Sequence, residues 1–313
     1  MPKYSEELLQ LFDTLFITMG GIETTLIYHE KLNLPYFSAF DILKSKEGRD
    51  ILIRLYQSYA DIAEKYNVNF LMESPTWRAS KDWGDKLGYT PEALDRVNIN
   101  AIQMMNDIRN KFSNSAIKIL LAGCIGPRGD AYQIDKKMSV QEAYDYHITQ
   151  ISSFSKTNVH LITAATIGYV EEAIGIANAA HFKKLPVIIS FTVETDGRLP
   201  SGDKLKDAIE KVDLATNKIP MCYMINCAHP DHFTSLFLES ESWHNRICGI
   251  LANASSKSHT ELDTATELDE GDPIEMSHNY LRLKKLLKHL TIVGGCCGTN
   301  QQHIEAICKK LVC

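Results

Sequence analysis

The chain has 313 residues, of which 44% are hydrophobic and 23% are charged, a composition typical of a folded globular protein. A net charge of −6 without any Lys/Arg cluster argues against a nucleic-acid-binding protein, which needs a basic face. The start, MPKYSEELLQLFDTLF, lacks the basic residues and unbroken apolar stretch of a signal peptide, and no segment reaches the ~20 apolar residues that cross a membrane. We therefore expect a cytoplasmic protein that binds no membrane and whose eight cysteines are mostly reduced.

Eight short apolar runs, rich in Ile, Val, Leu and Phe, recur along the chain, and each is closed by Gly, Pro, Ser, Thr or Asn. None alternates cleanly between apolar and polar residues, a pattern typical of strands buried on both faces of a parallel sheet. The runs begin at Leu15, Asn69, Lys118, His160, Leu185, Pro220, Arg246 and Leu290.

Segments with apolar residues at helical spacing separate these runs. Thr90 followed by Pro91, and Ser139 followed three residues later by Glu142, are helix-start signals. The segments cover residues 47–66, 90–112, 139–154, 169–184 and 273–290.

Eight strand candidates that alternate with helices predict an α/β fold, namely a single-domain (β/α)₈ TIM barrel over residues 1–313. A doubly wound open sheet is the alternative, because closure is not visible in a sequence. The polar stretch 255–272 is expected to be a long loop after the seventh strand, at the barrel face where loops carry function.

Three cysteines lie where strand candidates end. Cys296 and Cys297 close the eighth run, and Cys227 closes the sixth. Every strand of a barrel delivers its C-terminal end to the same mouth, so we expect the three thiols to meet. Three thiolates with one open position form a layout known for catalytic zinc. The glycines nearby would let the backbone bend so that adjacent cysteines reach one ion; they are Gly294, Gly295 and Gly298.

The other thiols have simpler expected roles. A vicinal pair could also form a redox disulfide, but its spacing is not the C-x-x-C of thiol oxidoreductases. A lone cysteine in a strand or helix is usually a small core residue. That is the expectation for Cys124, Cys222, Cys248 and Cys308, whereas the terminal Cys313 has no expected role.

Four motifs resemble the homocysteine S-methyltransferase family in order and spacing over nearly the whole chain. They are GGCCGT at 294–299, INC at 225–227, GCIGP at 123–127 and the pair Gly20-Gly21. The resemblance implies a (β/α)₈ barrel that transfers a methyl group to the sulfur of a thiol such as homocysteine, a step of methionine biosynthesis. It also implies that the zinc ligands are Cys227, Cys296 and Cys297.

Zinc suits such a reaction because a free thiol titrates near pH ~8.5 and carries little thiolate at neutral pH. Coordination removes the proton, so no catalytic side chain is needed beyond the metal centre. The expected partners are a small thiol acceptor and a small methyl donor. The family as a whole suggests a sulfonium, a quaternary ammonium or a methylated folate as donor, and the oligomeric state is open.

Two positions differ from the family pattern. Met19 stands where members usually carry an Asp, and Ala165 stands where they tend to carry a Glu; these acids typically hold the amino group of homocysteine. Glu23, just past the first strand, and Glu73, at the end of the second, are predicted to take over this role, with a solvated loop position as the simpler alternative. The remaining residues predicted to bind substrate are Gly20, Gly21 and Asn253.

Other strand-end residues are weaker candidates. His229 is a possible substitute ligand or a solvated loop residue. Trp77 and Trp83 are candidates to face a cationic donor or to pack under their loop. Arg128 is placed to meet a substrate carboxylate or to cap a turn.

Two other functions are compatible with the same sequence. A lyase or hydrolase would use strand-end acids such as Glu73 and Glu194, and it would keep its activity after replacement of Cys296 by Ser. A non-catalytic zinc or redox protein would hold zinc but bind no amino-acid thiol. Fold alone does not separate these functions.

Overall fold

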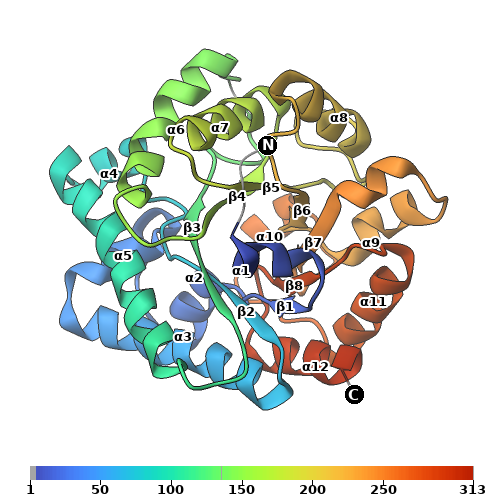
Figure 1. Cartoon of the computed structure of the whole chain (residues 1–313), viewed down its shortest axis with the longest axis horizontal. Helices are drawn as coiled ribbons and strands as arrows, with labels where there is room; N and C mark the ends of the chain where they lie inside the picture. The colour runs from blue at the N-terminus through green and yellow to red at the C-terminus, as the bar shows by residue number, and fades with distance from the viewer. Residues whose placement is uncertain (1–4, 135, 313) are drawn as a thin grey trace.

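The computed structural model describes residues 5–134 and 136–312. Its strands are all parallel and close into a barrel in the order β1 to β8, so the predicted (β/α)₈ barrel is confirmed. Figure 1 shows the helices as a ring around the strands. The strands are β1 (Phe16–Ile17), β2 (Asn69–Glu73), β3 (Ile119–Ile125), β4 (Leu161–Ile167), β5 (Val187–Phe191), β6 (Tyr223–Asn226), β7 (Ile247–Ala252) and β8 (Ile292–Gly295).

The helices of the described residues include five that the periodicity predicts, which are α3, α5, α6, α7 and α11. In chain order the α-helices are α1 (Glu6–Leu9), α2 (Ile22–Thr24), α3 (Lys46–Tyr66), α4 (Lys81–Lys86), α5 (Pro91–Lys111), α6 (Val140–Phe154), α7 (Val170–Phe182), α8 (Leu205–Thr216), α9 (Pro230–Phe233), α10 (His259–Asp263), α11 (Pro273–Leu286) and α12 (Gln301–Val312). Shorter helical turns are η1 (Gln10–Phe12), η2 (Thr25–His29), η3 (Pro35–Phe37), η4 (Ala39–Lys44), η5 (Thr234–Phe237) and η6 (Ser242–Arg246).

The predicted helix starts are observed. Thr90 accepts a hydrogen bond from the Ala93 amide at the start of α5. Ser139 and Glu142 form a reciprocal capping box at the start of α6. Such contacts satisfy amide groups that the first helical turn leaves unpaired, so the local sequence alone determines where these two helices begin.

The barrel is closed at its N-terminal end by the start of the chain. Leu8 of α1 and Leu11 of η1 are buried in one cluster with side chains of the strand interior, such as Leu71 and Ile292, and α1 lies across the centre of the view in Figure 1. The hydroxyl of Thr291 donates a hydrogen bond to the Leu11 carbonyl. Ligands therefore reach the barrel from the opposite, C-terminal face. No helix of the described residues has the length and apolar character needed to span a membrane.

Two of the cysteines expected to be simple core residues are bonded to each other. Cys222 lies just before β6, Cys248 lies in β7, and the two form a disulfide with their Cα atoms 5.9 Å apart. The prediction that each of these cysteines is an isolated core residue is wrong, because it considered each one without the other. Their pairing depends on the register between neighbouring strands β6 and β7, which no local pattern reveals.

The polar stretch after β7 is not wholly a loop. It contains α10, which begins with a capping box between Ser258 and Glu261. A helix of five residues is too short to show a helical period, so the sequence pattern missed it. This segment lies at the C-terminal mouth, where it contributes His259, Leu262 and Asp263 to the wall of a cavity.

Candidate metal centre and substrate cavity

Three thiols converge at the C-terminal mouth of the barrel. The sulfurs of Cys227, Cys296 and Cys297 all lie within 4.8 Å of one another, and those of Cys227 and Cys297 are 3.7 Å apart. Tetrahedral zinc with Zn–S bonds of about 2.3 Å requires sulfurs about 3.8 Å apart. Three soft donors at this spacing, with room for a fourth ligand, therefore fit a catalytic zinc ion.

The end of β7 holds the cysteine backbones together. The amide of Cys227 donates to the Leu251 carbonyl, and the amide of Cys296 donates to the Ala252 carbonyl. The carbonyl of Cys297 accepts from the Ala254 amide. Because β7 lies between β6 and β8 in the barrel, one strand end sets the positions of all three cysteines.

The three neighbouring glycines do not share one role. Gly298 has a φ of +80°, which is the turn predicted after the cysteine pair. A Cβ on Gly294 would lie 1.8 Å from Oγ1 of Thr18, and a Cβ on Gly295 would lie 2.0 Å from Oγ1 of Thr299. These two glycines thus permit close packing rather than bending, which corrects the expectation for them.

The predicted glycines of the first strand end have a similar packing role. A Cβ on Gly20 would meet the Thr299 carbonyl oxygen at 2.7 Å, and a Cβ on Gly21 would meet the Cys296 carbonyl oxygen at 2.6 Å. The Gly21 amide donates to the Thr299 carbonyl. Both glycines therefore support the turn that carries the cysteine pair, and their role in binding substrate stays a prediction.

The thiols influence one another electrostatically. Hydrogen bonds from Cys296 and Cys297 hold the pKa of Cys227 well below its usual value. Hydrogen bonds with Cys227 and Cys296 raise the pKa of Cys297. A lowered pKa favours the thiolate, which is the form of cysteine that binds a metal ion.

A cavity of about 370 Å³ lies above the thiols and has Cys227 and Cys297 in its wall. It receives side chains from the loops after several strands, as expected for the ligand-binding face of a barrel. The other lining residues include Thr24, Tyr28, Phe37, Trp77, Arg78, Asp130, Tyr132, Thr166, Asn253, Ser255, His259, Leu262, Asp263, Glu267, Leu268 and Asp269.

Glu23 and Glu73 are not solvated loop carboxylates. Burial raises the pKa of Glu23 to about 7 and the pKa of Glu73 to about 7. The negative charges of Cys227 and Glu73 further oppose ionisation of Glu23. Oε1 of Glu73 is buried without a hydrogen-bond partner among the described residues. Met19 and Ala165, where the family acids would stand, are buried. Neither glutamate is among the residues that line the cavity, so their predicted role in holding an amino group stays a prediction.

Asn253 lies directly after β7 and lines the same cavity. The residue is 5% exposed, and its Oδ1 has no hydrogen-bond partner in the described part of the chain. A buried amide oxygen without a partner costs free energy. A bound substrate with a donor group would remove that cost.

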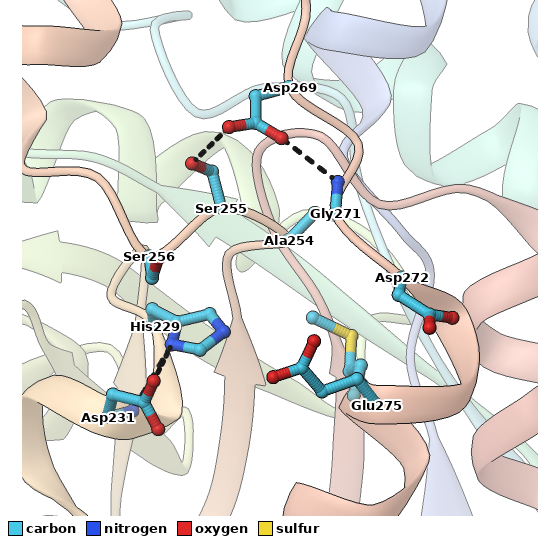
Figure 2. A pocket seen from close by; sticks show the side chains of 10 residues that line it. His229, Asp231, Ala254, Ser255, Ser256, Asp269, Gly271, Asp272 and Glu275 are labelled. Carbon is cyan, nitrogen blue, oxygen red and sulfur yellow. Dashed lines mark hydrogen bonds and ion pairs between the residues drawn. The ribbon is translucent and has the colours of Figure 1, made fainter.

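His229 is not among the residues that line this cavity; it lines a smaller one of about 120 Å³. Figure 2 shows its imidazole pointing into that side cavity, which the carboxylates of Asp231 and Glu275 also face. Its Nδ1 accepts a hydrogen bond from the Asp231 amide. His229 is not part of the three-thiol group, so the structure does not support the idea of a substitute ligand.

Of the other candidates, Arg128 is occupied elsewhere, because its Nε donates to Asp82 at 2.8 Å. Trp77 lines the cavity and its Nε1 donates to the Ala165 carbonyl. Trp83 is 8% exposed and packs against the guanidinium of Arg78.

Sequence reasoning missed two residues of the site. Tyr132 donates a hydrogen bond from its hydroxyl to the Cys227 carbonyl at 2.7 Å, and its ring stacks on His259 with centroids 3.5 Å apart. Arg78 lines the cavity beside Trp77. The available signal for Arg78 was a basic residue directly after Thr76 and Trp77, in the loop that follows β2. Tyr132 lies in a loop with no strand-end signal.

A model of the family described as homocysteine S-methyltransferase matches residues 16–311. The chain belongs to this family. The match spans every strand of the barrel, from β1 to β8.

Several relatives of this family are similar over nearly their full length. Homocysteine S-methyltransferase 2 of Arabidopsis thaliana is 22% identical over 94% of this chain and 92% of its own. Selenocysteine Se-methyltransferase of Brassica oleracea var. italica is 23% identical over 98% of this chain and 92% of its own. The metallated form of the homocysteine methyltransferase MmuM from Escherichia coli shares the fold, with a TM-score of 0.75 at 16% identity, and the match covers 97% of this chain and 99% of MmuM.

Proposed function

We propose that the protein is a zinc-dependent S-methyltransferase that moves a methyl group from a small donor to the thiolate of homocysteine or a closely related amino-acid thiol. The observation that carries the proposal is the convergence of three thiols within 4.8 Å at the floor of a cavity large enough for small substrates. Family membership supports the reaction type, and the names of the plant relatives support a thiol or selenol acceptor.

Cys227, Cys296 and Cys297 would hold the ion. Bound zinc would keep the sulfur of an acceptor ionised at neutral pH and in a fixed position. The sulfur then forms a bond to the methyl carbon, the bond between that carbon and the donor breaks, and its electron pair leaves with the donor. With homocysteine as acceptor the product is methionine, and the thiol proton is lost to solvent when the acceptor binds.

Glu23 and Glu73 are proposed to bind the ammonium group of the acceptor. A positive charge beside a buried carboxyl favours its ionised form, so an ammonium group would offset the burial that raises both pKa values. The side-chain amide of Asn253 would donate a hydrogen bond to the same substrate, or accept one from it, across the cavity. In this chain the two glutamates would thus do what the family acids at the positions of Met19 and Ala165 do elsewhere.

The segment after β7 is proposed to keep water from the reacting atoms. Leu262, Ala265 and Leu268 add apolar surface to the cavity wall, and the stacking of His259 on Tyr132 attaches this segment to the loop after β3. Removing water strengthens the electrostatic contacts within the site.

The decisive experiment measures zinc content and methyl transfer together. The wild-type protein, purified with a reductant, should hold about one zinc ion per chain and methylate homocysteine from at least one of a sulfonium, a quaternary ammonium or a methylated folate. Separate replacement of Cys227, Cys296 and Cys297 by Ser should remove both zinc and activity. Replacement of Cys308 by Ala, in α12 and away from the mouth, is the matched control and should retain both.

The same measurements separate the alternatives. Wild-type protein without zinc, or activity that survives Cys296→Ser, would support an acid–base enzyme. Full zinc occupancy without binding of any amino-acid thiol would support a non-catalytic zinc protein.

A further inference from the structure

Arg78 is placed to meet a negative charge inside the substrate cavity. It follows β2 and lines the cavity above Cys227 and Cys297. Among the described lining residues it is the only Lys or Arg. The carboxylates in the same wall are Asp130, Asp263, Glu267 and Asp269.

The guanidinium of Arg78 is not matched by a carboxylate of the protein. Glu23, Asp130 and Asp263 act on its charge from a distance, but Arg78 makes no ion pair with a described residue. Nη1 donates to the Tyr36 carbonyl, and Nε is buried without an acceptor in the described part of the chain. A half-buried guanidinium in this state is costly unless an anion joins it.

Two aromatic rings hold the guanidinium in place. Its Cζ lies 4.1 Å from the ring centroid of Trp83 and 4.8 Å from that of Trp77. Stacking fixes the plane of the five-donor fork. A group held in its binding geometry before the ligand arrives loses less entropy on binding, so the two rings prepare Arg78 for a planar anion.

We propose that Arg78 binds the carboxylate of the amino-acid substrate that occupies the cavity above the three thiols. The inference rests on the proposed function, because it assigns the partner of a substrate group in that same site. Planar guanidinium and carboxylate groups pair through two parallel hydrogen bonds. An acidic wall with one arginine accepts a zwitterion better than a simple cation, because the acids meet its positive group and Arg78 meets its negative group.

A carboxylate can be supplied by the acceptor or by the donor, and acceptor binding is measured first. The zinc-loaded protein is titrated calorimetrically, without donor, with homocysteine, with 4-mercaptobutanoate, which lacks the amino group, and with 3-aminopropane-1-thiol, which lacks the carboxylate. If the acceptor carries the partner group, Arg78→Gln weakens binding of the first two by about 10- to 100-fold and leaves the third within about twofold. Arg78→Lys, which keeps the charge but not the fork, should fall between Gln and wild type.

A second set of measurements tests the donor. If the donor carries the carboxylate, Arg78→Gln leaves acceptor binding unchanged and raises KM for S-methylmethionine by about 10-fold or more, but not KM for trimethylsulfonium, which has no carboxylate. Arg128→Gln is the matched control, because Arg128 pairs with Asp82 and does not line the cavity. It should change none of these values.

Two outcomes overturn the inference. Equal weakening of all ligands by Arg78→Gln would show that Arg78 only holds the loop of Tyr36 in place, and no weakening of any ligand would show that it has no role in binding. Thermal unfolding and zinc content of each variant identify a folding defect. If Arg78→Gln has such a defect, the ligand affinities of Arg78→Lys are compared with those of the wild type instead. Failure of the proposed function looks different: the wild-type protein itself would bind none of the thiols and turn over neither donor.

Discussion

The side chain of Asn226, at the end of β6, makes two hydrogen bonds to Thr166, at the end of β4. Its Oδ1 accepts from the Thr166 amide at 2.8 Å, and its Nδ2 donates to the Thr166 hydroxyl at 2.8 Å. Thr166 has a φ of +63°, a conformation that a β-branched residue adopts only when its surroundings impose it. Cys227, the next residue after Asn226, has a φ of +58°. Asn226 thus connects the strained end of β4 to Cys227, which directly follows β6.

Replacement of Asn226 by Ala should weaken both the fold and metal binding. It leaves the buried Thr166 amide without an acceptor, and we expect a loss of about 2–4 kcal/mol in the free energy of unfolding together with weaker zinc binding. Urea unfolding and competition with a chromophoric chelator measure the two effects. Ser190→Ala is the control, because it removes only the hydroxyl that donates to Asn226; it should cost about 1 kcal/mol and leave zinc affinity unchanged. Wild-type zinc affinity in Asn226→Ala would contradict this role.

Replacement of Gly295 by Ala should displace the cysteine pair. The new methyl group would lie 2.0 Å from Oγ1 and 2.7 Å from Cβ of Thr299, so rotation of the hydroxyl alone does not relieve the clash. We expect a loss of stability of about 1–3 kcal/mol and reduced zinc content. Gly129→Ala is the control, since its new Cβ meets no atom within 4 Å. Similar melting temperatures for the two variants would argue against the close packing.

The burial of Glu73 predicts a specific dependence of stability on pH. Because its pKa rises from 4.5 to about 7 in the folded protein, the folded state keeps a proton that the unfolded chain has released between these values. The free energy of unfolding should therefore fall as the pH rises through this window, by an upper limit of about 3 kcal/mol. Glu73→Gln should flatten this part of the curve, measured by urea unfolding from pH 5 to 8.

Glu64→Gln, on the exposed side of α3, is the control for the Glu73 experiment and should keep the wild-type slope. An unchanged slope in Glu73→Gln would mean that Glu73 ionises as it does in the unfolded chain. Its carboxyl would then lie in water rather than in the barrel mouth.

The Cys222–Cys248 disulfide predicts a reductant-sensitive stability. It closes a loop with a sequence separation of 26, and a link of this length stabilises a protein by about 2–4 kcal/mol. Reductant should lower the melting temperature of the wild-type protein but not that of the Cys222→Ser/Cys248→Ser double variant. Peptide mapping without reductant should recover the two cysteines in one linked pair. Two separate peptides with free thiols would contradict the bond.

Much of the fold was predictable because its signals are local. Apolar runs that end in turn residues identified each strand, and the cap at Ser139 identified the start of a helix. Once the strands were assigned to a barrel, the position of Cys227 at one strand end and of Cys296 and Cys297 at another predicted that they would meet. That inference needs only the rule that parallel strands end at one face.

The tertiary structure decided what depends on register, burial and long-range contacts. The bond between Cys222 and Cys248 requires the residue just before β6 to lie beside a particular position of β7. The raised pKa of Glu73 depends on burial in the packed barrel, and the hydrogen bond from Arg78 to the Tyr36 carbonyl joins residues that are distant in the chain. Sequence determines which side chains a strand end or loop carries. How deeply each side chain is buried, and which other side chains it contacts there, depends on the packing of the whole barrel.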